Sequence, residues 1–310
     1  MAFEFPRCHI IPLPDDQVSF QIDGAERTRW HFGSQYPRPF FYPFNGPSGE
    51  TLTRMGHPGA PNHDHHRSVW FAHHKVDGVN FWGDSTESKI EQKQWLCYRD
   101  GNDEAIMASL LSWQVGHEGA EIIQQQLVAA IRPTDVNGET LIELQSTFTP
   151  TAAKVEFQRT NFGFLAVRVA KHISKHFGSG ELTNSEGARG EQNIFGKPAR
   201  WMDYSGTVPG PEQRKGMQGI TYIDHPSNPG QPMHWHVRED GWMGASVCMK
   251  GPQLVTKDKP LTVRFLLHAH AGDIDIERAT AIANSFAISK RLEVRKARAR
   301  HQQYEVVRLK

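Results

Sequence analysis

The sequence has few cysteines and no long apolar run. Its three cysteines, Cys8, Cys97 and Cys248, are too widely spaced to indicate a disulfide framework or a metal-binding motif. No stretch approaches the roughly 18 apolar residues of a membrane-spanning helix, and the first residues lack the basic and apolar segments of a secretory signal. We therefore expect a cytoplasmic protein with reduced thiols and no membrane partner.

The chain also lacks an excess of charge of one sign and the motifs of nucleotide-dependent enzymes. Its 35 Lys and Arg residues balance 34 Asp and Glu residues, which argues against a nucleic-acid partner. No Gly-x-Gly-x-x-Gly segment, phosphate loop or Gly-x-Ser-x-Gly turn occurs, so neither a nucleotide cofactor nor a serine nucleophile is predicted. We expect no cofactor, with a divalent metal as the alternative, and a small carbohydrate as the partner. The sequence is compatible with an oligomer.

Apolar and polar residues alternate along most of the chain, which is typical of half-buried β-strands. Turn signals at Asp77-Gly78, at residues 101–103 and at Asn137-Gly138 each predict a hairpin. Helical periodicity occurs mainly in residues 275–300. Because strands joined by tight hairpins form antiparallel sheets, we predict an all-β fold: a large antiparallel β sandwich in a single domain of the whole chain, with a C-terminal helix.

Histidine is abundant, with 17 residues, and a first group lies in residues 56–67, before an aromatic strand. His63 and His65 alternate, so in an extended segment they share a face and can ligate a metal. Alternatively, His66 with Arg67 can hydrogen bond to sugar hydroxyls or a carbonyl and act as acid or base, because imidazole titrates near neutral pH. A third interpretation is a polar loop held by its own hydrogen bonds.

A second group of histidines lies in residues 224–238. Asp224 and His225 begin a loop fixed by prolines. In the extended segment that follows, His234 and His236 share one face, with Trp235 opposite. If the two histidine groups meet at one end of a sheet, they form a concave polar site. Two unrelated surface loops are the alternative.

A third segment, residues 184–206, contains a glycine-rich loop followed by a stretch with arginine, tryptophan and aspartate. Glu186 lies in the loop and is the candidate for a lone carboxylate base, with a solvated charge as the alternative. Arg200 and Trp201 are candidates for the lining of the site. The eight tryptophans favour sugar binding, because a flat ring can stack on the apolar face of a pyranose, although most are expected in the core.

Several motifs together resemble the PmoA-like family of uncharacterised bacterial proteins, whose members often carry the label methane oxygenase. The resemblance covers about residues 38–268. It rests on His65-His66-Arg67, Phe81-Trp82-Gly83, Ser185-Glu186-Gly187, Ala199-Arg200-Trp201, Asp203-Tyr204-Ser205-Gly206, residues 224–229 and Trp235-His236-Val237-Arg238. The chain departs from the family's first motif, since Asn62 and Asp64 stand where the family tends to have aspartate and proline.

The methane oxygenase label does not suit this sequence, because the membrane enzyme needs spanning helices. The family is also similar to the galactose-mutarotase-like β supersandwiches, which move protons on a sugar with histidines and a carboxylate in an open cleft. This resemblance implies a supersandwich in which His66, His225 or His236 is the acid and Glu186 or Asp224 is the base.

We therefore predict a carbohydrate-active protein that binds a sugar or sugar derivative in a His- and Arg-rich cleft, with acid–base chemistry of the epimerase, lyase or hydrolase type. The alternatives are a metal-dependent enzyme and a non-catalytic carbohydrate-binding protein. The residues predicted to be catalytic are His66, Glu186, Asp224, His225 and His236. Those predicted to bind substrate are Arg54, Arg67, Trp70, Arg200, Trp201 and Arg238. The alternative metal ligands are His63, His65 and His236.

Overall fold

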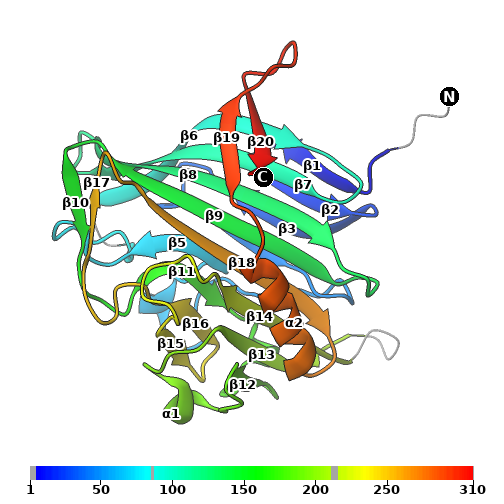
Figure 1. Ribbon diagram of the computed structural model, residues 1–310. Coiled ribbons are helices and arrows are strands. Elements are labelled where there is room, and N and C mark those ends of the chain that lie inside the picture. The colour runs from blue at the N-terminus through cyan, green and yellow to red at the C-terminus, as the bar shows by residue number, and fades with distance from the viewer. Residues whose placement is uncertain (1–4, 85–86, 211–215, 310) are drawn as a thin grey trace.

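The fold is built mainly from antiparallel strands (Figure 1). The computed structural model describes residues 5–84, 87–210 and 216–309. Two eight-stranded sheets share one apolar core, so the predicted all-β antiparallel sandwich is confirmed.

Sheet I has the strand order β1 (Cys8–Leu13), β2 (Gln17–Ile22), β3 (Ala25–His31), β4 (Phe40–Phe44), β5 (Val69–His73), β11 (Gly163–Arg168), β16 (Trp242–Ala245) and β15 (Trp235–Arg238). Sheet II has the order β12 (Glu181–Asn184), β13 (Trp201–Val208), β14 (Gly216–Asp224), β18 (Leu261–Ala271), β9 (Thr140–Pro150), β8 (Ala120–Pro133), β7 (Ala105–Val115) and β6 (Ser88–Arg99). The remaining elements are the pairs β10 (Lys154–Phe157) with β17 (Gln253–Thr256) and β19 (Leu292–Lys296) with β20 (Tyr304–Arg308), helices α1 (Glu191–Ile194) and α2 (Ile276–Ala287), and two short 3-10 turns.

The predicted hairpin turns form, and two of them join full strands. Asn137-Gly138 turns the chain between β8 and β9, with Gly138 at a φ of 84°, which glycine adopts without steric cost. Residues 101–103 join β6 to β7. Asp77-Gly78 also makes a tight turn, but it closes only an isolated bridge, and residues 79–82, all of them described, form no strand.

Side-chain alternation along each strand decides what fills the space between the sheets. Phe71 of β5 meets Phe148 of β9 and Phe265 of β18, with ring centroids 6.4 and 6.3 Å apart. Trp235 of β15 packs edge-on against Tyr222 of β14 at 4.8 Å. Each aromatic side chain buried in this way stabilises the sandwich by about 1.5–3 kcal/mol, because its apolar surface leaves water.

The outer face of sheet I carries a second apolar cluster. Trp70 and Ala72 of β5 point to this side, as do Ala166 of β11 and Trp242 of β16, and Trp82 packs against them. Alternate side chains of a strand point to opposite sides of the sheet. The strands whose inward side chains fill the core therefore also place this apolar cluster on the outer face.

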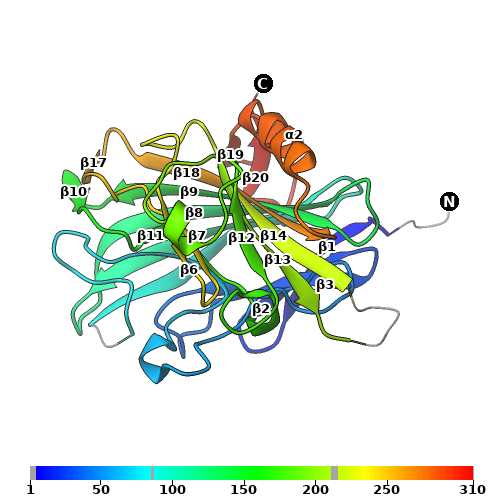
Figure 2. The same ribbon diagram turned by 90° about the horizontal axis from the view of Figure 1, so that it is seen from below.

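Helix α2 covers part of the outer face of sheet II (Figures 1 and 2). Its N-cap Asp275 accepts a hydrogen bond from the backbone N–H of Arg278 at 3.0 Å. The helix is shorter than predicted, since residues 288–300 leave it and β19 pairs with β20 instead. Leu292 and Val306 of this hairpin pack on the outer side of β7 and β8, and that contact outweighs the local helical pattern. Among the described helices, none is long and apolar enough to cross a membrane.

Candidate functional site

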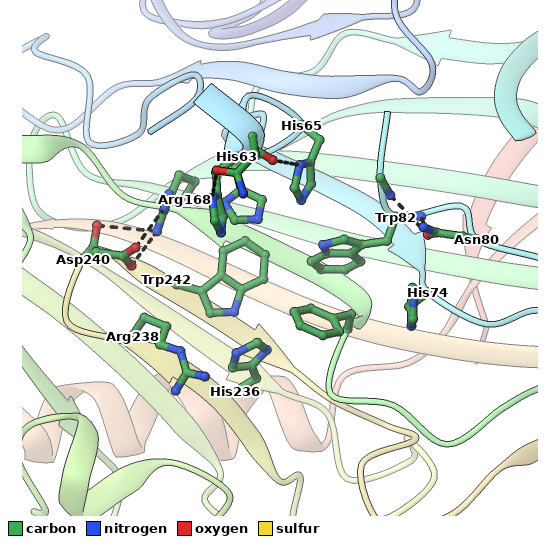
Figure 3. A pocket seen from close by; sticks show the side chains of 14 residues that line it. His63, His65, His74, Asn80, Trp82, Arg168, His236, Arg238, Asp240 and Trp242 are labelled. Carbon is green, nitrogen blue, oxygen red and sulfur yellow. Dashed lines mark hydrogen bonds and ion pairs between the residues drawn. The ribbon is translucent and has the colours of Figure 1, made fainter. Parts of the chain in front are cut away.

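A cavity of about 390 Å³ lies on the outer face of sheet I (Figure 3). His66 and His236, one from each histidine group of the sequence, both line it, so the structure brings the two groups together. The lining residues are Asn62, His63, His65, His66, His74, Asn80, Trp82, Gly83, Phe162, Arg168, His236, Arg238, Asp240 and Trp242.

The pleat of sheet I aims the polar side chains into this cavity. In β15, Trp235 and Val237 belong to the core between the sheets, and His236 points the opposite way. Arg168 of β11 and Trp242 of β16 pair across the sheet and lie on the same side as His236. His236 is 4% exposed and Arg168 is 1% exposed, so the polar groups of the site are held in a largely desolvated wall.

Three tryptophans form the wall behind the histidines. The ring centroids of Trp70, Trp82 and Trp242 lie 5.3–5.5 Å from one another. Each indole is buried, and its Nε1–H has no hydrogen-bond partner among the described residues. A buried donor without a partner costs free energy, so this wall carries hydrogen-bonding capacity that the protein itself does not use.

His66 packs directly on the tryptophan wall. Its ring centroid lies 4.8 Å from that of Trp242 and 5.7 Å from that of Trp70. Burial lowers the pKa of His66 far below the usual value for histidine, and the Arg168 guanidinium lowers it further. The ring is therefore neutral at pH 7, and its Nδ1 has no partner in the described part of the chain.

His63 and His65 lie beside His66, with ring centroids 5.0 and 4.3 Å from its ring. The His65 Nδ1 lies 3.1 Å from the backbone oxygen of Asn62, which can only accept, so this nitrogen carries a proton. Burial, and next to it the Arg38 guanidinium, lowers the pKa of His65 to about 4. Its Nε2 is therefore an acceptor at neutral pH.

His236 lies among aromatic rings. Its ring centroid is 5.0 Å from that of Phe162, 5.4 Å from that of Phe195 and 5.8 Å from that of Trp242. Burial, and next to it the Arg238 guanidinium, lowers the pKa of His236 to about 4. Its Nδ1 has no partner among the described residues, so a second neutral imidazole with a free nitrogen faces the cavity.

A buried ion pair fixes the turn between β15 and β16. Arg168 donates to the two carboxylate oxygens of Asp240, from Nη1 at 2.7 Å and from Nη2 at 3.2 Å. His57 donates to the same carboxylate from Nε2 at 3.0 Å, because its Nδ1 accepts the Gly59 N–H. Burial raises the pKa of Asp240, but Arg168 and His57 outweigh that effect and hold it below its usual range. Asp240 is ionised and already engaged.

A second arginine–carboxylate group borders the cavity at Gly83. Arg38 is 2% exposed, donates to the Gly83 oxygen at 2.7 Å and lies 3.1 Å from Asp84. Arg67 donates to both carboxylate oxygens of Asp84, at 3.0 and 2.5 Å. Arg67, predicted to bind substrate, is therefore held by Asp84 and does not line the cavity.

A family model matches residues 17–284, which is most of the chain. The chain belongs to the family of unknown function DUF6807. This match corrects the PmoA-like assignment, which rested on short motifs scattered along the sequence. No curated protein matches this DUF6807 chain, so its activity has to be argued from the cavity.

The DUF6807 fold places Asp224 and His225 away from the cavity, at the end of β14 in sheet II. The His225 Nε2 accepts a hydrogen bond from Arg264 at 2.8 Å, and its ring packs on Phe286 of α2 at 4.8 Å. Asn228 donates to Asp224 at 2.6 Å, and burial raises the pKa of Asp224 to about 7. The two residues take part in the packing between sheet II and α2, although in sequence they lie close to His236.

Four further candidates of the DUF6807 chain lie outside the cavity lining. Glu186 is exposed and accepts a hydrogen bond from the Ser185 hydroxyl. Arg200 donates to Asn284 of α2 at 2.6 Å, and Trp201 is buried against the same helix. Arg54 donates to the backbone oxygen of Asp240 at 2.7 Å, behind the wall.

Sequence reasoning missed several residues that the DUF6807 cavity uses. Arg168 and Asp240 are the main ones, together with His74, Asn80 and Phe162. Arg168 gave one signal that could have been used: it is the only charged residue in the apolar stretch 163–170, and a buried charge needs a partner. Asp240 gave none, because its pairing with Arg168 depends on how β11 and β16 meet.

The metal alternative, with His63, His65 and His236 as ligands, is an untested prediction. In residues 5–84, 87–210 and 216–309, no three His, Cys, Asp or Glu side chains gather in an arrangement that could hold a metal ion. His66 and His236 pack beside aromatic rings.

Proposed function

We propose that this DUF6807 protein binds a sugar or sugar derivative in the cavity on sheet I and moves a proton on it with His66 and His236. The observation that carries the proposal is the pairing of an aromatic wall with buried polar nitrogens that have no partner among the described residues. The volume of about 390 Å³ lies within the range of small-molecule sites, roughly 300–1,000 Å³.

The wall supports a ligand with one apolar face and a polar edge. The faces of aromatic rings carry negative charge density and attract the weakly positive C–H groups of a pyranose. Trp82, Trp242 and Phe162 supply such rings in the lining. Around them, His65 offers an acceptor nitrogen, and His66 and His236 offer one free nitrogen each, which suits the hydroxyl groups of a sugar.

The histidines support acid–base chemistry because they are neutral. A neutral imidazole can accept a proton from the ligand and return it, provided that the bound ligand brings the pKa closer to the working pH. His66 and His236 both contact the Trp242 ring, at 4.8 and 5.8 Å between centroids, so one ligand can reach both. Asp240 is occupied by Arg168 and His57, which leaves the imidazoles as the proton carriers.

Calorimetric titration with a panel of hexoses, pentoses and short oligosaccharides tests the binding. We expect His236→Gln to weaken binding at least about tenfold, since it removes a hydrogen bond inside a desolvated site. His225→Gln is the matched control, because His225 is equally buried but lies on sheet II. Absence of binding to the whole panel contradicts the proposal, as does equal weakening by the two variants.

Proton transfer is tested separately by incubating bound sugars in D₂O and following C–H signals by NMR. Deuterium incorporation or conversion that is lost in both His66→Gln and His236→Gln supports catalysis. Tight binding without exchange or conversion favours the second candidate, a non-catalytic carbohydrate-binding protein. One observation already favours that candidate: Asp240 is the one carboxylate in the described lining, and it is held by an ion pair.

We also propose that the protein works in the cytoplasm, without a nucleic-acid or membrane partner. The three cysteines Cys8, Cys97 and Cys248 are all unpaired, which suits a reducing compartment. Fractionation of cells expressing the chain with a fluorescent tag tests the location.

A further inference from the structure

Guanidinium groups outnumber carboxylates in the lining of the cavity. The guanidiniums of Arg168 and Arg238 line it, and Asp240 is the one carboxylate in the described lining. The chain as a whole carries a net charge of only +1, so positive charge is concentrated here. A largely desolvated cavity with an excess of positive charge attracts an anion.

One arginine is held in place with part of its guanidinium still available. Arg238 donates from Nη1 to Glu191 at 2.7 Å and lies over the Phe195 ring, with its Cζ 4.6 Å from the centroid. These two contacts fix the plane of the guanidinium. The Arg238 side chain as a whole remains 45% exposed. The guanidinium of Arg168, by contrast, is engaged on both Nη nitrogens by Asp240.

Two further polar atoms lie next to Arg238. His236 stands two residues earlier on the same face of β15, and its Nδ1 is buried without a partner among the described residues. The same holds for the Nε1–H of Trp242, and Figure 3 shows the nitrogen edge of this indole turned toward His236, with Arg238 alongside. The Arg238 guanidinium, the Trp242 indole N–H and the His236 imidazole therefore lie together at one end of the cavity.

We infer that the ligand carries a carboxylate, and that this group sits between His236, Arg238 and Trp242. The inference rests on the proposed function and narrows the ligand to acidic sugars such as uronates. A carboxylate is planar and has two acceptor oxygens, which matches the two-pronged geometry of an arginine side chain. It also supplies an acceptor for the Trp242 Nε1–H, which is buried without a partner among the described residues.

The test compares sugars that differ only at one carbon. Calorimetry on the full chain measures the affinity for D-glucuronate against D-glucose and for D-galacturonate against D-galactose, with D-glucose 6-phosphate as a second anion. We expect each uronate to bind at least about tenfold more tightly than its neutral partner, as charge-assisted hydrogen bonds allow. Arg238→Gln should remove most of this preference, and Arg238→Lys should keep part of it, because an ammonium group keeps the charge but lacks the fork.

Arg200→Gln is the control, since Arg200 is bound to Asn284 of α2, which lies on sheet II, and it should keep the wild-type preference. Equal affinity within each pair, or a uronate preference that survives Arg238→Gln, overturns the inference and leaves the proposed function standing. Stronger binding of the sugar phosphate than of the uronate also overturns it. Failure of neutral and acidic sugars alike overturns the proposed function and this inference with it.

Discussion

The outer faces of the two sheets both bury titratable side chains, but they satisfy them differently. On sheet II, two buried carboxylates have titratable partners: Asp203 accepts a hydrogen bond from His270 at 2.9 Å, and Glu139 accepts from His268 at 2.9 Å and from Arg278 at 2.9 and 2.5 Å. The His270–Asp203 contact raises the pKa of His270 against the effect of burial, which lowers it.

On sheet I, the buried histidines have no such partners. The Nδ1 atoms of His66 and His236 and the indole nitrogens of Trp70, Trp82 and Trp242 lack hydrogen bonds within the described residues. A completed network holds a fold together, and an incomplete one is tolerated only where something else completes it. The contrast lies in the buried histidines, because on sheet II the Trp201 Nε1–H also lacks a partner among the described residues.

Replacing one histidine on each face by leucine tests whether the two faces contribute differently to stability. His270 and His236 are both 4% exposed. His270→Leu leaves the Asp203 carboxylate buried without its charged partner, and we expect a loss of roughly 3 kcal/mol in the free energy of unfolding. His236→Leu removes a hydrogen bond to the Asn161 backbone but leaves no charge unpaired, so it should lower that free energy by only about 1 kcal/mol. Urea unfolding measures both, and equal losses would end the distinction.

The second prediction concerns pH. His236 titrates near 4 in the folded protein and near 6.5 when unfolded. Folding therefore favours the neutral ring, so its contribution is complete above about pH 6.5 and is lost as the pH falls toward 4, by roughly 3 kcal/mol in total. The charged groups facing this ring are Arg238 and Asp240. His236→Leu should flatten the acid limb of the stability curve over this interval.

His270 should act with the opposite sign. Its folded pKa is raised, so its contribution is complete below its unfolded value near 6.5 and is lost as the pH rises through the folded value. In His270→Leu the curve should lose stability mainly on the acid side. If the two variants bend the curve in the same direction, the two faces do not differ as described.

The third prediction joins pH to binding. A carboxylate placed beside His236 stabilises its protonated form, so binding of glucuronate should take up a proton. We expect the affinity for glucuronate to rise roughly tenfold between pH 7 and pH 5, and the affinity for glucose to change little. Titrations in two buffers of different ionisation enthalpy count the proton. No uptake in wild type, or the same uptake in His236→Leu, would argue against this placement.

The smallest effect is expected at the start of α2. Asp275→Ala removes the acceptor for the Arg278 N–H and should lower the free energy of unfolding by about 1 kcal/mol. Asp275→Ser keeps a capping oxygen and should lose less. Neither variant should alter sugar affinity, because α2 lies on sheet II. A change in affinity would show that the two faces are coupled.

Local patterns in the sequence were enough to predict the class of fold. The Asn137-Gly138 turn and the alternating strands around it depend on neighbouring residues, so the hairpin of β8 and β9 could be predicted from the sequence. The structure of the C-terminal segment could not be predicted in this way. Residues 290–300 continue a helix-like spacing, but β19 pairs with β20 because Leu292 and Val306 find an apolar surface on β7 and β8.

The site was predicted only in part for the same reason. His66 and His236 were singled out by histidine density, and the structure brings them together. Asp224 and His225 belong to the same sequence cluster, yet the chain crosses from β14 in sheet II to β15 in sheet I before it reaches His236. Which sheet a strand joins depends on long-range pairing, and no spacing along the sequence reports it.

The pleat of sheet I separates the residues that hold the fold together from those that line the cavity. In β15, Trp235 and Val237 belong to the interior, and the residues between and after them, His236 and Arg238, face the cavity. Substitutions at His236 and Arg238 can therefore change the cavity with little effect on folding. Among DUF6807 members we therefore expect residues 236 and 238 to vary more freely than residues 235 and 237.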